Sequence, residues 1–213
     1  MATPGATDTP SPTPTQNPGG VSIINNHSWY VDSINYLHIV GEVYNGTDDD
    51  LRFVKVTANF YTNSGQLIDT EFTYVILTTL PAFDKSCFDL LIPQPAGWGY
   101  YTFEPVGYWD DADPPHALEI SNTSTSYQST FGWYKILGEV TNEEPYRLEF
   151  VYPVGTVYDQ QGIVLGCTST YVSSKHLDPG QKSSFEMLFS GRDYLNVATY
   201  RVQAEGNPSI NSR

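Results

Sequence analysis

Histidine and cysteine are the residue types that most often build metal sites and nucleophilic centres, but their spacing in this chain favours neither. The sequence contains no His-x-His, His-x-x-x-His or Cys-x-x-Cys spacing, no Gly-x-Ser-x-Gly turn and no phosphate-binding glycine loop. The scattered residues concerned are His27, His38, His116, His176, Cys87 and Cys167. The sequence therefore predicts no zinc site, no cofactor and no catalytic residue.

Two glutamates recur in the sequence, Glu42 and Glu139, and each directly follows a glycine within a predicted strand. Two carboxylates on facing strands are the arrangement that glycoside hydrolases use. Both strands, however, have the alternating pattern of a half-exposed sheet. We therefore expect both carboxylates on solvated strand faces, not in a catalytic pair.

Asp110, Asp111 and Asp113 form one acidic cluster, and Asp48–Asp50 form another. Calcium binds about six to eight oxygen ligands, which loops between sandwich domains can supply. The second copy of the repeat described below has Pro145-Tyr-Arg147 in place of Asp48–Asp50, so a site there would not belong to a shared module. We expect solubilising charge, with calcium binding at Asp110, Asp111 and Asp113 as the alternative.

Four aromatic residues form a candidate ligand site: Trp98, Tyr100, Tyr101 and Trp109. Exposed rings on a sandwich can stack on a sugar or on a partner protein. The second copy has Asn196-Val-Ala-Thr-Tyr200 at this place, so the cluster belongs to the first copy alone. We expect the rings to fill the end of a sandwich and the contact between domains, with ligand binding as the alternative.

Cys87 and Cys167 are too few to form a disulfide framework. We expect two separate, small, buried apolar side chains. A disulfide between these cysteines would have to cross between the two domains proposed next.

The elements that carry these residues occur twice. Ile39-Val-Gly-Glu-Val-Tyr-Asn45 returns as Ile136-Leu-Gly-Glu-Val-Thr-Asn142, with an offset of 97 residues between the two glycines. The same offset, without a gap, aligns Leu51-Arg-Phe-Val54 with Leu148-Glu-Phe-Val151. This period is the size of one sandwich domain and is far too long for a solenoid repeat, so it predicts a tandem duplication.

Within each copy the hydrophobic period is two. Val54, Val56, Ala58 and Phe60 alternate with polar residues, which is the pattern of a half-buried strand. Several such strands separated by glycine turns predict an all-β fold with two tandem immunoglobulin-like antiparallel β-sandwich domains. The predicted divisions are a spacer at 1–20, sandwiches at 21–107 and 118–206, a linker at 108–117 and a tail at 207–213.

Residues 1–20 contain five of the 15 prolines, interleaved with threonine. Such a segment cannot bury enough apolar surface to fold, and proline keeps it extended. We expect a disordered spacer that holds the sandwiches off a surface, in an exported prokaryotic protein whose signal was replaced by the start methionine. The rival is the disordered tail of a cytosolic protein. No apolar run has the roughly 20 residues of a membrane helix, so any membrane contact would come from a removed N-terminal lipid anchor.

The order of motifs in the second copy resembles the FxLYD domain, an immunoglobulin-like module of bacterial and archaeal exported proteins and lipoproteins. These motifs are Gly138-Glu-Val-Thr-Asn142, Val157-Tyr-Asp159 with Gly162, Leu177-Asp-Pro-Gly180 and Phe185. The first copy departs further, with Phe60-Tyr-Thr62 and Leu80-Pro-Ala-Phe-Asp84. The resemblance implies a fold and an extracellular or cell-surface location, and it implies no reaction.

The net charge of −14 argues against nucleic acid and against anionic membrane surfaces as partners. We therefore expect a non-catalytic module of the cell envelope with a structural or protein-interaction role. One alternative is a carbohydrate-binding module that uses the aromatic residues of the first copy. A second is a subunit of an extracellular assembly, in which a sheet edge or the N-terminal segment pairs with another copy.

Overall fold

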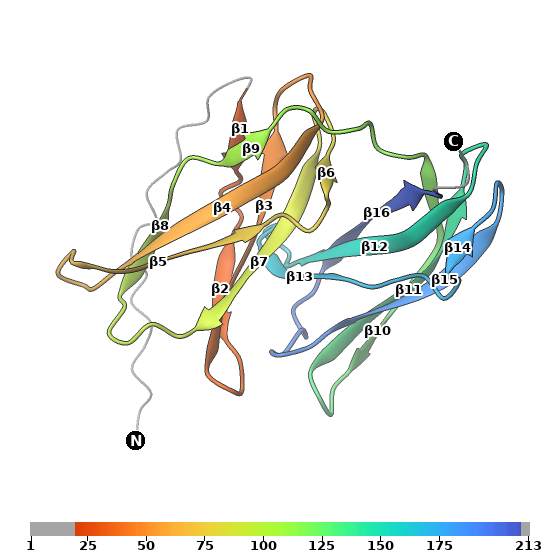
Figure 1. Ribbon diagram of the computed structural model, residues 1–213. Helices are drawn as coiled ribbons and strands as arrows, with labels where there is room; N and C mark the ends of the chain where they lie inside the picture. The colour runs from red at the N-terminus through yellow and green to blue at the C-terminus, as the bar shows by residue number, and fades with distance from the viewer. Residues whose placement is uncertain (1–19, 210–213) are drawn as a thin grey trace.

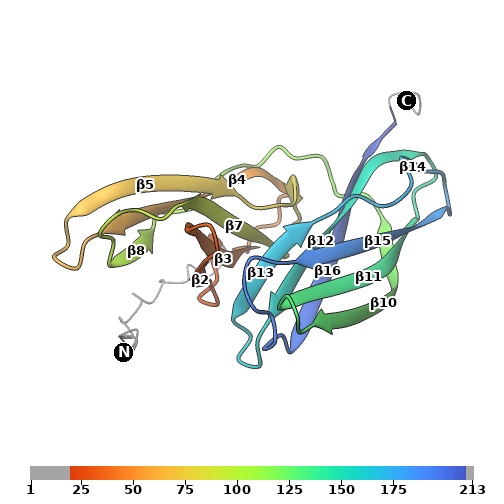
Figure 2. The same ribbon diagram turned by 90° about the horizontal axis from the view of Figure 1, so that it is seen from below.

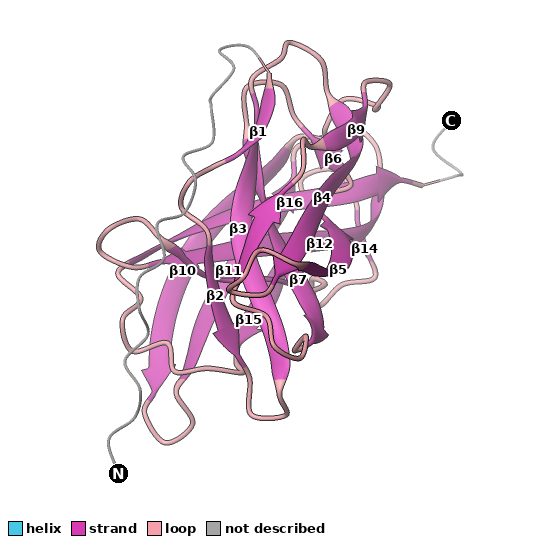
Figure 3. Ribbon diagram, turned by 90° about the vertical axis from the view of Figure 1, so that its left-hand side faces the viewer, coloured by secondary structure: helices cyan, strands magenta, loops and turns pink. Residues whose placement is uncertain are grey.

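The computed structural model describes residues 20–209, which form strands joined by turns and loops (Figure 3). This range contains no helix, and hence none with the length and apolarity needed to cross a membrane. The predicted all-β sandwich fold is confirmed. The predicted spacer and most of the predicted tail lie outside the described residues.

The front half, residues 20–109, contains two antiparallel sheets. The β3 sheet has the order β1-β3-β2 with β7 also paired to β3, and the β4 sheet has β5, β6, β8 and β9 around β4. The strands are β1 Val21–Ile23, β2 Ser28–Val31, β3 Tyr36–Asn45, β4 Leu51–Tyr61, β5 Leu67–Tyr74, β6 Thr79–Leu80, β7 Lys85–Pro93, β8 Tyr100–Phe103 and β9 Gly107–Trp109.

The back half, residues 118–209, repeats this plan with two further antiparallel sheets. The β11 sheet has the order β10-β11-β15, and the β12 sheet has β13, β14 and β16 around β12. The strands are β10 Leu118–Gln128, β11 Trp133–Asn142, β12 Leu148–Tyr158, β13 Val164–Ser169, β14 His176–Leu177, β15 Lys182–Phe189 and β16 Thr199–Pro208.

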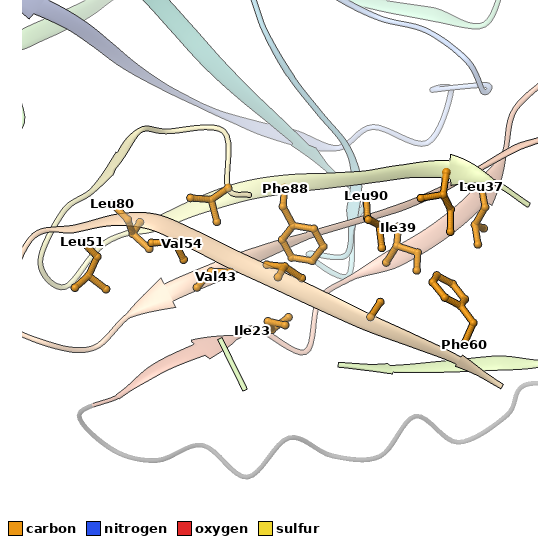
Figure 4. Packing of buried hydrophobic residues seen from close by; sticks show 14 residues of the cluster. Ile23, Leu37, Ile39, Val43, Leu51, Val54, Phe60, Leu80, Phe88 and Leu90 are labelled. Carbon is orange, nitrogen blue, oxygen red and sulfur yellow. The ribbon is translucent and has the colours of Figure 1, made fainter. Parts of the chain in front are cut away.

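Each half encloses a hydrophobic cluster of its own between its two sheets. In the front half, Phe88 and Leu90 of β7 and Ile39 of β3 face Phe60 of β4 (Figure 4). The alternation predicted for β4 is confirmed, because its apolar positions are buried and the polar residues between them are partly exposed. Burial of these side chains is the main force that holds the sheets together.

The repeat predicted from the sequence is visible in the strand bounds. An offset of 97 residues carries both ends of β3 onto β11 and both ends of β4 onto β12. Asn45 and Asn142 repeat the same role, since each donates from Nδ2 to the carbonyls of a following turn and of Leu80 or Leu177. These asparagines therefore close the turn after the strand, as expected for Asx geometry.

Gly41 of β3 and Gly138 of β11 occupy equivalent positions, and at each of them a phenylalanine ring lies against the backbone. A Cβ atom would stand 2.7 Å from Cζ of Phe88 at Gly41 and 2.6 Å from Cζ of Phe185 at Gly138. Any larger residue would displace a core ring, so these glycines are required by packing.

Two predicted boundaries differ from the structure. The linker was expected to begin at residue 108, but Gly107–Trp109 form β9, which pairs with β4 beside Arg52 and Lys55. The tail was expected to begin at residue 207, but β16 continues to Pro208 and the next residue, Ser209, is buried. In both places the backbone pairs with a long central strand and so extends the sheet. No pattern of side chains in the sequence predicts this pairing.

The two halves pack against each other through β13. This strand lies against β3 and β7 of the front half (Figures 1 and 2). The outward face of the β3 sheet is therefore covered, and β3 is buried on both faces along most of its length.

Candidate functional site

Glu42 is the most deeply buried charged residue of the contact between the halves, with 1% of its surface exposed. Its Oε1 accepts a hydrogen bond from the hydroxyl of Tyr158 at 2.5 Å. Its Oε2 accepts from Lys85 Nζ at 2.8 Å and from Asn26 Nδ2 at 2.7 Å. The pKa of Tyr158 is raised above its usual range, chiefly by burial and in addition by the hydrogen bond and negative charge of Glu42. The hydroxyl therefore keeps its proton and remains a donor.

The prediction that Glu42 lies on a solvated strand face is wrong. Alternation along β3 does turn Glu42 away from the front core, but that outer face is covered by the back half. The equivalent Glu139 fits the prediction better, because it is partly exposed and its Oε2 accepts from Asn122 at 2.6 Å. The two glutamates do not form a catalytic pair, since the partners of Glu42 are Asn26, Lys85 and Tyr158, whereas Glu139 is bound by Asn122.

The prediction of two separate cysteine side chains is also wrong. Cys87 of β7 and Cys167 of β13 form a disulfide that joins the halves, with 6.0 Å between their Cα atoms. Cys87 is directed away from the front core because it alternates with the buried ring of Phe88. The sequence separation of 80 residues gives no sign that these two strands meet.

A second group of contacts between the halves surrounds Glu205 of β16. Its carboxylate accepts from the backbone N–H groups of Thr78 at 2.6 Å and Thr79 at 3.2 Å, and from the hydroxyl of Tyr152 at 2.7 Å. Burial raises the pKa of Glu205 although these donors oppose the change. Burial also raises the pKa of Tyr152 to about 12. These bonds connect the start of β6 and the residue before it to the β12 sheet.

The acidic residues considered for calcium lie in the segment between the halves, beside a cleft of about 850 Å³. Asp111 and Asp113 line this cleft, and Asp110 is exposed outside its lining. Both carboxylate oxygens of Asp111 accept from the Arg52 guanidinium at 2.6 Å. This pairing lowers the pKa of Asp111, chiefly through the hydrogen bond from Arg52.

A calcium ion would therefore have to displace a bidentate guanidinium from Asp111. Within residues 20–209, no group of three or more His, Cys, Asp or Glu side chains is arranged to hold a metal ion. Calcium binding by Asp110, Asp111 and Asp113 stays a prediction.

The four predicted aromatic residues do not form one site. Trp98 and Tyr101 pack against the front core, where their ring centroids lie 6.5 Å apart. Tyr100 stacks on Tyr61 with a centroid distance of 5.1 Å. Trp109 is 61% exposed on β9 and belongs to a different group of rings.

That group covers the outer face of the β4 sheet and is called the outer aromatic surface here: Phe53, Phe72, Tyr74 and Trp109. Adjacent ring centroids are 6.4 Å apart for Phe53–Tyr74, 6.1 Å for Phe53–Trp109 and 5.9 Å for Phe72–Tyr74. About half or more of each residue is exposed. Contiguous exposed rings on a folded surface usually mark a binding site.

Two cations lie over these rings. Lys55 Nζ is 4.1 Å from the centroid of Phe72, and the Arg52 guanidinium lies 5.3 Å from Phe53 and 5.5 Å from Trp109. Cation–π contacts of this kind hold rings in a fixed orientation. Phe53, Phe72 and Tyr74 are not among the residues predicted from the sequence, although Phe72 and Tyr74 alternate on β5 with residues that face the other way.

No known family model matches the sequence, and no curated protein does either. Solved structures with some likeness include red sea bream transglutaminase, with 14% identity over 86% of this chain and a TM-score of 0.25. The exo-chitosanase CsxA of Amycolatopsis orientalis is 11% identical over 85% of this chain, with a TM-score of 0.28. The chain spans 29% of the first protein and 25% of the second. At these values neither likeness bears on activity.

Proposed function

We propose that this protein is a non-catalytic module of the cell envelope or extracellular space, with a structural or protein-interaction role. The main support for this proposal is that covalent and hydrogen bonds join the two halves. One disulfide and the buried Glu42 carboxylate join β3 and β7 to the β12 sheet. Structural disulfides persist in oxidising compartments, which supports export.

Two sandwiches held in a fixed arrangement could serve as a rigid spacer or as a platform that binds other proteins. Arg201 of β16 adds an ion pair to Asp84 at 2.6 Å, so contacts between the halves extend beyond the disulfide. Surfaces on the two halves would then keep a fixed separation and orientation, which a flexible linker alone would not provide. The Thr/Pro-rich segment 1–20 would hold this unit away from its anchor, in keeping with the FxLYD resemblance.

Cell fractionation with thiol alkylation in the producing organism tests this proposal. We expect the protein in the envelope or medium, with Cys87 and Cys167 resistant to alkylation until a reductant is added. Recovery in the cytosol with both thiols open to alkylation would refute the exported module.

A second candidate function, glycan binding, is favoured by the outer aromatic surface. Four exposed rings form an apolar surface against which sugar rings can pack, and Trp109 is the most exposed of them. Affinity electrophoresis in polysaccharide gels tests this function. Trp109→Ala should reduce retardation, while Tyr108→Ala, which removes an exposed ring outside that surface, should not. Equal mobility of the wild type with and without polysaccharide would exclude this function.

A further inference from the structure

Phe53 and Phe150 occupy equivalent positions in the two halves and share an unusual backbone conformation. Their φ angles are +51° and +53°, in the left-handed region that aromatic residues rarely adopt. Both lie where strand pairing shifts register, between Arg52 and Lys55 in β4 and between Glu149 and Tyr152 in β12. A bulge of this kind redirects a side chain.

The redirected rings face outward. Phe53 is 53% exposed and Phe150 is 62% exposed, whereas the valine that follows each of them is buried in the core. This backbone conformation costs free energy, and an apolar ring left in solvent does not recover that cost by burial. Strain kept at an exposed position is typical of a ligand-binding site.

In the back half the exposed ring lines a groove of about 620 Å³. Tyr171, which is 66% exposed, contributes a second ring to the lining. The backbone N–H of Val172 donates to the carbonyl of Val151 at 3.1 Å, so the segment with Tyr171 is held beside the bulge. Lys175 and His176 add polar groups to the lining.

We propose that this groove, between β12 and the segment from Tyr171 to His176, binds a neutral, β-linked polysaccharide. Pyranose rings with equatorial hydroxyls have apolar C–H faces that pack on Phe150 and Tyr171, while their hydroxyls reach Lys175, His176 and the serines of the groove. A groove lined by two exposed rings fits an extended sugar chain.

The charges in and around the groove argue for a neutral occupant. The net charge of −14 repels polyanions over long range. The groove lining itself carries one charge of each sign, Lys175 and Glu149, so it does not present the single-sign surface that a charged polysaccharide needs. The carboxylate of Glu149 is engaged, since its Oε1 accepts from Ser209 Oγ at 2.8 Å.

This inference rests on the glycan-binding candidate function but assigns it a separate site. In the front half, Phe53 contacts Tyr74 and Trp109, so the equivalent position belongs to the outer aromatic surface. Trp109→Ala therefore tests the outer aromatic surface and leaves the groove intact. Variants of Phe150 and Tyr171 test the groove alone.

The test is an NMR titration of the oxidised full chain with cellohexaose and with xylohexaose. We expect amide shifts at residues 149–151 and 171–176. Phe150→Asn should weaken binding by about ten-fold or more and leave the melting temperature unchanged or higher, because asparagine tolerates the left-handed region. Tyr171→Ser should weaken binding similarly.

Phe131→Ser is the matched control, because Phe131 is an equally exposed ring of the back half outside the groove. It should leave the affinity unchanged. The proposal is overturned if neither sugar shifts the groove amides, or if both groove variants bind like the wild type. It is also overturned if oligogalacturonate or an aromatic peptide binds the groove more tightly than either sugar.

Discussion

Glu42 and Glu139 occupy equivalent positions in the two halves but have different environments. Only Glu42 lies in the contact between the halves. Glu42 accepts hydrogen bonds from Tyr158, Lys85 and Asn26, whereas Glu139 is partly exposed. A buried carboxylate is tolerated only when its oxygens are hydrogen-bonded and its charge is paired. Glu42 satisfies this condition only because the back half supplies Tyr158.

We expect Glu42→Gln to lower the free energy of unfolding by about 1–3 kcal/mol, because the amide cannot pair with Lys85 and presents an N–H₂ to one of its former donors. Glu139→Gln, at the equivalent position, should change it by less than about 0.5 kcal/mol. Urea denaturation of both variants measures the difference. Equal effects would show that Glu42 contributes nothing beyond a strand-surface glutamate.

His38 is a residue whose protonation should affect stability. Burial alone would lower its pKa, but hydrogen bonds and charge from Asp89 and Asp32 outweigh burial and raise it above 6.5. Since the folded pKa exceeds the unfolded one, the stabilisation is fully present below pH 6.5 and is lost as pH rises through the folded pKa.

The stability of the wild type relative to His38→Gln should therefore be greater at pH 6 than at pH 9. Urea denaturation at several pH values measures this difference. An NMR titration supplies the control, because burial lowers the pKa of His27, so that ring should titrate below 6.5 and His38 above it. A pH-independent difference would contradict the assigned ion pairs.

At the scale of the elements, β7 and β13 carry the covalent link. The loop closed by Cys87 and Cys167 spans 80 residues, and closing a long loop restricts the unfolded chain. We expect the double variant Cys87→Ala/Cys167→Ala to lose about 2–4 kcal/mol of unfolding free energy. Urea denaturation checks this, with the reduced wild type as a control that should behave like the variant. A midpoint equal to that of the oxidised wild type would contradict it.

The strands themselves were predictable from the sequence. Alternation at Val54, Val56, Ala58 and Phe60 identifies β4 and its buried face, and the offset of 97 residues transfers that assignment to β12. These features are local, so a single sequence contains them. The turns closed by Asn45 and Asn142 follow from the same local chemistry.

The site could not be predicted in the same way because it depends on which faces meet. The alternation that places Glu42 away from the front core predicts exposure, and only the docked back half reverses it. Burial of Cys87 is predicted from its residue type, but its pairing with Cys167 is not. Trp109 is a candidate from the sequence, but the ring beside it in the structure, Phe53, comes from β4, and the ring beside Phe53, Tyr74, comes from β5. Side-chain groups assembled from separate strands leave no continuous motif.

At the scale of the whole molecule, the proposed function requires the front and back halves to form one rigid body. The disulfide, the Glu42 bonds and the Glu205 bonds fasten three places along the contact between the halves. Interfaces within a chain that lack such fastening usually allow relative motion. A fixed arrangement is what the proposed spacer or platform role requires.

Residual dipolar couplings of backbone N–H groups in the oxidised protein show whether the two halves form one rigid body. If the halves form one body, couplings from residues 20–109 and from residues 118–209 will fit a single alignment tensor with the orientation seen in Figure 1. Two tensors of different magnitude would mean that the halves move independently, and the account of a rigid module would then be wrong.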